Sequence, residues 1–350
     1  SREANQIKSF LSSKDLIKVV EVPLLFESKL DSLFDVIIVT DIKEEKQNEL
    51  INNRDKAKEQ ILFYGGYFIM AKKAEVVKIN YRNCVFFIDN DKIEKDLYTV
   101  MSILDKGSEN LTEFDRFTLL SIYKTAYHTD GKIEGITSLD STATNCEFCK
   151  AIRKANESNK LCICNDCYDR QQESYRLAVL SRHTLNMLIM STVEFTVDEL
   201  KMLTVTPLIR VNSSGDTPNE IYARNMIKMC YAFPFAKVGY WAKNVTPIIK
   251  ACDSLGKPSN LTLIQSSCMI GKPATKAKYF DYVFTVYPDK ETTEKAIAEG
   301  ASSCNGKKCK DCKYKCYFGN HDGNGNIAEV LRGASKDKIK AIKALLEMEA

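Results

Sequence analysis

The residues best suited to chemistry are cysteines, and most of them lie in two clusters. The second cluster, "CNGKKCKDCKYKC", carries Cys304, Cys309, Cys312 and Cys316. Thiolates at such short spacings can reach one centre, and either Zn²⁺ or an iron–sulfur cluster accepts four sulfur ligands. Structural zinc usually combines two CxxC units across a longer loop, so the compact run favours an iron–sulfur cluster over zinc. The interleaved lysines would offset thiolate charge.

The first cluster contains two CxxC units, Cys146/Cys149 and Cys164/Cys167, with Cys162 between them. Two such units separated by a loop resemble a zinc ribbon or zinc knuckle, in which Cys162 is a fifth thiol, free or structural. Three arrangements are open. Each cluster binds its own metal, the two share one metal, or the first binds zinc and the second an iron–sulfur cluster.

Composition indicates a reducing compartment for these thiols. The chain has 13 cysteines but no hydrophobic signal segment and no apolar run of membrane-spanning length, so we expect a cytoplasmic protein whose cysteines bind metal rather than form disulfides. A formal charge of +4 is too small to predict nucleic-acid or membrane binding by itself. The chain starts with Ser rather than Met, so we expect a piece of a longer protein. The remaining cysteines are expected to be small buried apolar residues: Cys84, Cys230, Cys252 and Cys268.

The three histidines give no catalytic order. His321 follows the second cluster in a Gly/Asn-rich loop, where exposure is favoured over metal ligation. His183 lies in an apolar helical segment and is interpreted as a hydrogen-bonded core residue. His128 lies in a polar loop, and the sequence assigns it no role.

Alternating strand-like and helical segments predict an α/β fold. In the first third, strands are expected at 17–26, 35–40, 76–79 and 84–90, with charged helical sequence between the second and third. The alternation predicts a parallel sheet there. The domain boundaries that we expect are 1–106, a linker at 107–115, a Cys-rich domain at 116–335 and a C-terminal helix at 336–350.

Four successive βα units follow a helix expected over residues 171–200. The expected strands are 207–216, 236–244, 260–268 and 281–288. The expected helices are 217–233, capped by Thr217 with Pro218 at the first position, then 245–256 closed by Gly256, 273–280 and 289–300. These parallel βα repeats predict a partial-barrel-like sheet.

Polar residues stand at the carboxyl ends of the expected strands, where ligands bind in parallel α/β folds. Turn and cap residues are polar in any case, but their recurrence after successive strands favours a shared pocket for a small molecule. The pocket residues expected on this basis are Asn212, Ser214, Asp216, Lys243, Asn244, Gln265 and Ser266.

The last two-thirds of the chain, about 116–332, resembles the phage and bacterial Cys-rich family of the gene product 88 type. The resemblance rests on "CNDCY" (164–168), "LIRVNSSGD" (208–216), "AKVGYWAKN" (236–244) and "CKDCKYKCYFG" (309–319). It implies a barrel-like α/β fold with a metal or iron–sulfur site. Radical-SAM enzymes are an analogue, but their CxxxCxxC motif is absent from the sequence.

Residues 1–106 resemble the C-terminal half of dephospho-CoA kinases, through "VVEVPLLFESKLDSLFDVIIVT" and "FFIDN". These P-loop enzymes phosphorylate the ribose hydroxyl of dephospho-CoA with MgATP. The resemblance implies acceptor-side roles for Pro23, Leu24, Phe26 and Glu27, a lid role for Arg54 and an adenine-side role for Asn90. The GxxxxGK[ST] phosphate loop is absent from the sequence, so this chain alone is not expected to be an efficient kinase.

Three functions remain open from the sequence. The first is a metal-binding α/β protein of unknown reaction, whose cofactor is an iron–sulfur cluster or zinc. The second is a zinc-stabilised binding module, with nucleic acid as one possible partner. The third is a dephospho-CoA kinase in coenzyme A biosynthesis, which would use MgATP in a parent protein that supplies the missing half.

Overall fold

The computed structural model describes residues 78–88, 91–304, 307–313 and 315–348. The chain divides into two compact units. The first comprises Ser1–Tyr98 with Ser174–Ser181, and the second comprises Thr99–Glu173 with Arg182–Ala350. The kinase-like positions Pro23, Leu24, Phe26, Glu27, Arg54 and Asn90 lie outside the described residues.

A β-hairpin begins the described part of the first unit. Strands β1 (Lys78–Tyr81) and β2 (Cys84–Phe87) pair antiparallel across the turn residues Arg82 and Asn83, whose φ angles are 48° and 61°. Such a two-residue left-handed turn can join only antiparallel strands, so the parallel pairing expected for these two strands is wrong. Ser181 Oγ accepts from the Phe87 backbone N–H at 3.1 Å and donates to the Phe87 carbonyl at 2.8 Å.

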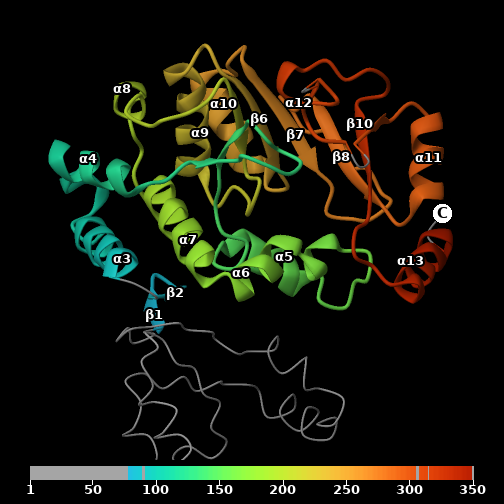
Figure 1. The fold of residues 1–350 in the computed structure, drawn as a ribbon, viewed down its shortest axis with the longest axis horizontal. Helices are drawn as coiled ribbons and strands as arrows, with labels where there is room; N and C mark the ends of the chain where they lie inside the picture. Colours follow the sequence, from blue (N-terminus) through green and yellow to red (C-terminus); the bar gives the residue numbers. More distant parts are fainter. Residues whose placement is uncertain (1–77, 89–90, 305–306, 314, 349–350) are drawn as a thin grey trace, which may run out of the picture. The chain divides into compact units, whose positions relative to one another are not determined.

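The second unit is a mixed α/β domain built on a mostly parallel eight-stranded sheet flanked by helices (Figure 1). The strand order is β3-β4-β5-β6-β7-β8-β10-β9, and every neighbouring pair is parallel except β3–β4. In chain order the strands are β3 (Ala126–Tyr127), β4 (Thr137–Leu139), β5 (Leu208–Val211), β6 (Lys237–Ala242), β7 (Leu261–Ser266), β8 (Tyr282–Tyr287), β9 (Ser302–Ser303) and β10 (Asn326–Val330).

The helices before and between these strands follow ordinary capping rules. Thr112 caps α4 through a capping box with Asp115, and Gly256 ends α10 at a φ of 77°, as expected. The helical segments are α3 (Asp91–Leu104), η2 (Ser108–Asn110), α4 (Glu113–Ile122), α5 (Glu147–Ala155), η3 (Ile163–Asp166), α6 (Tyr168–Tyr175), α7 (Leu177–Thr192), α8 (Val197–Leu200), α9 (Glu220–Ala232), α10 (Val245–Leu255), α11 (Lys290–Ala298), α12 (Lys315–Phe318) and α13 (Lys336–Met348). No helix in the described ranges is both long and apolar enough to cross a lipid bilayer.

Three helix predictions are corrected. The helix expected over 171–200 is divided into α6, α7 and the short α8, which starts at a capping box of its own at Thr196. Asn219, not Thr217, caps α9, because its side chain reaches the Tyr222 backbone N–H at 3.0 Å. The segment 273–280 is not helical. Its Ala277 N–H donates to Gln265 Oε1 at 2.8 Å, which holds this backbone against the sheet.

An apolar core on the sheet extends to the second cysteine cluster. Its fully or nearly buried members are Ile136, Trp241, Ile264, Tyr282, Tyr317 and Ile327, and Cys304, Cys309 and Cys316 pack against them. Helix α12 contacts β6 and β7, and it carries Tyr317 into an edge-to-face contact with Trp241. The second cysteine cluster therefore lies against the sheet rather than in a separate solvated loop.

We predict that Gly215→Ala destabilises the domain by about 2–4 kcal/mol. Gly215 has a φ of 77°, which costs an alanine about 1 kcal/mol, and a Cβ would lie 2.2 Å from Ser141 Oγ and 2.5 Å from its backbone, which adds an overpacking cost. Urea-unfolding free energies measure the effect. Gly135→Ala is the matched control, because Gly135 has a φ of 81° but no atom within 4 Å of the added Cβ. Equal losses in the two variants would contradict the close packing of these loops.

Candidate functional site

The loops that follow β4, β5 and β6 are joined at the carboxyl edge of the sheet by Asp216. This buried carboxylate accepts from the backbone N–H groups of Thr217 at 2.7 Å, Lys243 at 3.0 Å and Asn244 at 3.2 Å. The Asp216 carbonyl accepts from Ser141 Oγ at 2.6 Å. Burial raises the pKa of Asp216, while Lys243 and the three backbone donors act to lower it. One residue, through its carboxylate and its backbone carbonyl, thus joins the ends of three neighbouring strands.

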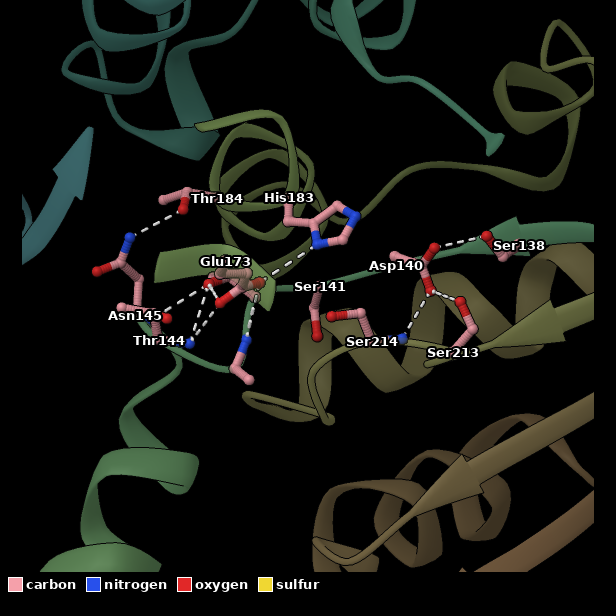
Figure 2. A network of polar contacts seen from close by, with 12 residues as sticks. Ser138, Asp140, Ser141, Thr144, Asn145, Glu173, His183, Thr184, Ser213 and Ser214 are labelled. Atoms are coloured by element: carbon pink, nitrogen blue, oxygen red, sulfur yellow. Dashed lines mark hydrogen bonds and ion pairs between the residues drawn. The ribbon is translucent and has the colours of Figure 1, made fainter. Parts of the chain in front are cut away.

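A second buried carboxylate, Asp140, stands directly after β4 (Figure 2). Its oxygens accept from Ser138 Oγ at 2.5 Å, from Ser213 Oγ at 2.6 Å and from the Ser214 backbone N–H at 3.0 Å. His128 Nε2 lies 2.9 Å from Ser138 Oγ and so extends this network toward the surface. The sequence assigned His128 no role, and in the structure its ring is hydrogen-bonded to Ser138 on β4.

Glu173 organises the chain between β4 and the first cysteine cluster. Its carboxylate, 1% exposed, accepts from Thr142 Oγ1 at 3.0 Å and from the backbone N–H of Thr144 at 2.9 Å (Figure 2). His183 Nδ1 lies 3.2 Å from the same carboxylate. Burial acts to lower the pKa of His183, but the acidic neighbours outweigh it and raise that pKa above 6.5. His183 is a hydrogen-bonded interior residue, as the sequence suggested.

The first cysteine cluster gathers around the ammonium group of Lys243. Cys146 and Cys149 are hydrogen-bonded to each other, and the Cys149 thiol interacts with both Asp216 and Lys243. Cys164 also interacts with Lys243 and Asp216, but its hydrogen-bond partner is Cys268. Cys268 is the second residue after the end of β7. Cys167 lies in the field of Lys243 and Cys164. The structure therefore adds Cys268 to the group that the sequence identified.

The pKa values of these thiols shift in opposite directions within each hydrogen-bonded pair. A hydrogen bond from Cys146 raises the pKa of Cys149 well above its usual value, and burial raises the pKa of Cys167. The opposite direction holds for Cys146 and Cys268, whose pKa values are lowered by the hydrogen bonds from their partner thiols. Each pair thus contains one thiol that is easier to ionise than the other. Metal binding would release protons from both.

The second cysteine cluster faces the guanidinium of Arg210 on β5. Burial acts to lower the pKa of Arg210, but Tyr317, Cys309 and Cys316 raise it. The Arg210 Cζ lies 4.2 Å from the centre of the Trp241 ring, a cation–π contact, and its buried Nε has no hydrogen-bond partner among the described residues. A fixed positive charge therefore lies beside the thiols, inside the core.

A second cation approaches the same cluster from the β3–β4 segment. Lys132 is hydrogen-bonded to Cys304, its Nζ lies 2.6 Å from Glu329 Oε1, and its carbonyl accepts from the Cys309 N–H at 2.8 Å. Burial raises the pKa of Cys304, and Lys132 acts to lower it. Lysine charge thus reaches the thiols from Lys132, outside the cluster sequence.

His321 contacts the second cluster directly and is not a free loop residue. Its Nε2 lies 3.0 Å from Cys316 Sγ, and its ring packs edge-to-face on Tyr282 with centroids 5.0 Å apart. Burial lowers the pKa of His321 to about 4, so the imidazole is neutral at pH 7. The prediction that this histidine is exposed is wrong, because the residue is half-buried against Tyr282. Its backbone N–H also donates to the Tyr282 hydroxyl at 3.2 Å.

Within residues 78–88, 91–304, 307–313 and 315–348, no three His, Cys, Asp or Glu side chains have a spacing that could hold a metal ion. The thiols are arranged as hydrogen-bonded pairs and electrostatic neighbours instead. The donor set itself is chemically suitable for a thiophilic metal, because each cluster offers at least four sulfur atoms next to a cation.

The residues predicted to line a pocket at the strand ends are only partly brought together. Asn212, Ser214, Asp216, Lys243 and Asn244 are brought together. Asn244 donates to the Thr217 carbonyl at 2.8 Å, and Asn212 donates to the Trp241 carbonyl at 3.0 Å. Gln265 turns instead to Ala277, and among the described residues neither it nor Ser266 is hydrogen-bonded through its side chain to Asp216 or Lys243.

The sequence interpretation missed several residues of the site. Three of them lie in "TSLDSTATNC" (137–146), a polar run that is mostly buried in the structure, and the other four are single residues elsewhere in the chain. A polar run that directly follows a short strand could have signalled the first group, whereas isolated residues such as Arg210 give no such pattern. The missed residues are Lys132, Ser138, Asp140, Thr142, Glu173, Arg210 and Cys268.

Comparison with known proteins defines the class of the second unit. Residues 116–341 match the family described as Gene product 88, and since they make up more than half of the chain, the protein belongs to this family. The match does not cover the kinase-like segment, and the dephospho-CoA kinase resemblance receives no support from the comparisons. No curated protein and no solved structure matches the chain.

We predict that His183→Gln destabilises the domain mainly at low pH. The pKa of His183 is raised by Glu173 in the folded state, so its stabilising contribution is fully present below pH 6.5 and is lost as the pH rises through the folded-state pKa. The difference in unfolding free energy between wild type and variant should shrink between pH 6 and pH 9, about the range in which a raised histidine titrates. His128→Gln serves as the control. A difference independent of pH would rule out the ionic contribution.

Proposed function

We propose that the gene product 88 domain is a metal–thiolate protein. In this proposal Cys304, Cys309, Cys312 and Cys316 bind an iron–sulfur cluster in preference to zinc at a second metal centre, and the thiols around Lys243 bind a metal at a first centre. Cys146, Cys149, Cys164 and Cys167 are the sequence-derived ligands of this first centre. The observation that carries the proposal is the buried charge of Arg210.

A buried guanidinium is costly unless an anion compensates it. The Asp140 carboxylate acts on Arg210 electrostatically, but it is hydrogen-bonded to Ser138, Ser213 and Ser214, and among the described residues it forms no ion pair with the guanidinium. Cys309 and Cys316 also act on Arg210, but they are uncharged as thiols. Metal binding converts thiols into thiolates and so would add negative charge beside the guanidinium.

The bound metal would contribute electron transfer or Lewis acidity, depending on its identity. The chain's own residues would fix its position. Arg210 and Lys132 would neutralise thiolate charge, and Trp241, Tyr282 and Tyr317 would exclude water from the sulfur atoms. Asp216 and Lys243 would link the first centre to the carboxyl edge of the sheet, where we propose that an unidentified small molecule binds.

Two alternatives have less support. A nucleic-acid-binding zinc module would need free lysines near the second cluster, but Lys308 and Lys310 both pair with Glu134, at 3.0 Å and 2.9 Å. A dephospho-CoA kinase would need a phosphate loop that this sequence lacks. Addition of a complete P-loop half followed by a phosphoryl-transfer assay would test the kinase, and absence of product would eliminate it.

The deciding experiment is anaerobic purification followed by a visible spectrum and by analysis of iron, zinc and acid-labile sulfide. We predict that Cys312→Ser lowers the metal content and the soluble yield, because it removes one thiolate ligand. Cys252→Ser is the matched control, since Cys252 is buried on α10 outside both clusters. Unchanged metal stoichiometry in Cys312→Ser would falsify the ligand assignment. Stoichiometric zinc without colour would replace the iron–sulfur cluster by a zinc site.

Arg210→Met tests the charge argument separately. If the guanidinium compensates thiolates, the variant should bind metal at the second cluster about tenfold more weakly or worse, as for other residues that support metal ligands. The metal-free variant should be at least as stable as the metal-free wild type, because a buried cation is replaced by an apolar side chain of similar length. Chelator competition and urea unfolding measure the two quantities. A large loss of apo stability with unchanged metal affinity would show that Arg210 serves only the core.

A further inference from the structure

Cys268 occupies a position that its sequence context does not indicate. It lies in the loop after β7, in the segment Ser267–Ile270, far in sequence from the first cysteine cluster. Ser267 fixes this loop, because its Oγ donates to the Lys272 carbonyl at 2.5 Å and accepts from the Met269 N–H at 3.3 Å. The thiol is half-buried, unlike the fully buried thiols of Cys230 and Cys252.

A short antiparallel bridge fastens this loop to the first cluster. Cys162 pairs with Met269, the Ile163 N–H donates to the Cys268 carbonyl at 2.9 Å, and the Ile270 N–H donates to the Leu161 carbonyl at 2.8 Å. Leu161 and Ile270 are buried together with Ile342 in a small apolar cluster. The bridge brings Cys268 beside Cys164, and the two thiols form a hydrogen bond.

Two thiol pairs therefore flank the same charges. Cys146 pairs with Cys149 at the start of α5, and Cys164 pairs with Cys268 across the bridge. Both pairs interact with Asp216, and Lys243 acts on a thiol of each pair. Cys167 differs, because its hydrogen bond comes from the Arg170 backbone rather than from a thiol, although it too lies in the field of Lys243 and Cys164.

The segment that carries these cysteines has little apolar packing of its own. No residue of α5 or η3 is buried, and the buried residue of α6 is Glu173, a carboxylate. Short segments with so little hydrophobic burial commonly depend on a metal or a disulfide for their order. A link to the loop after β7 would attach this segment to the rigid sheet.

We propose that the first metal centre uses Cys146, Cys149, Cys164 and Cys268 as its four ligands, and that Cys167 is not among them. The ligand class is a thiophilic divalent ion such as Zn²⁺, which prefers a closed tetrahedral set of four sulfurs. Each thiol gives its proton to solvent as it binds, so no oxidant or reductant is needed. The proposal rests on the proposed metal–thiolate function and changes the composition of one of its two centres.

The first test compares Zn²⁺ binding by wild type, Cys268→Ser, Cys167→Ser and the control Cys252→Ser in competition with a chelator. We expect Cys268→Ser to lose one equivalent of tightly bound zinc, with affinity at that centre reduced about tenfold or more, while the other two variants keep it. Retention by Cys268→Ser together with loss by Cys167→Ser would overturn the proposal.

A second measurement uses the wild-type chain and so does not depend on the folding of any variant. Thiols are alkylated with iodoacetamide with and without bound Zn²⁺, and labelling is measured at each cysteine by mass spectrometry. Protection of Cys268 together with Cys146, Cys149 and Cys164 supports the proposal. Protection restricted to Cys304, Cys309, Cys312 and Cys316 overturns it but leaves the proposed function in place. Wild-type protein that binds no metal at all would overturn both.

Discussion

The domain depends on one buried carboxylate, that of Asp216. A parallel sheet brings its strand ends to one edge, but the loops there have no regular partner for their backbone N–H groups. Asp216 supplies three acceptor contacts to the chain around it and ties the loop after β6 to the loop after β5. Ser141 attaches the loop after β4 to the same residue. Without this carboxylate, the backbone N–H groups of Thr217, Lys243 and Asn244 would lose the acceptor that holds the two loops together.

Positively and negatively charged side chains lie close together at this edge of the sheet. Asp169 lies in the field of Lys243, Asp140, Glu173 and Arg210, and burial raises its pKa to about 6. The two cations thus belong to one electrostatic system, although one faces the first cysteine cluster and the other faces the second. Interior charges of this kind are costly, and they concentrate at functional sites more often than elsewhere. The arrangement is therefore better explained by a ligand than by stability.

The sequence predicted the elements that repeat and missed those that do not. The strands of the βα units and the helix closed by Gly256 follow from apolar runs and cap residues, which are local signals. β4 was missed because two of its three residues, Thr137 and Ser138, are polar, yet both are buried, and Thr137 is hydrogen-bonded to the distant Thr206. The helix expected at 273–280 failed for a related reason, since a contact from Gln265 outweighs local preference. Both cysteine clusters were visible as spacing, but spacing cannot show Cys268 or Arg210, whose places depend on the sheet.

The contrast between the two clusters suggests different physical requirements for a bound metal. The second cluster packs against Trp241 and Tyr317 in an apolar core that would exist without metal, so a metal there adds charge and chemistry more than it adds structure. The first cluster lies on α5 and η3, which bury no side chain, and it meets the sheet through a two-residue bridge and the Lys243–Asp216 pair. A metal there would replace the hydrophobic packing that this segment lacks. On this argument a metal at the first centre would be structural, and a metal at the second centre would be the one placed to react.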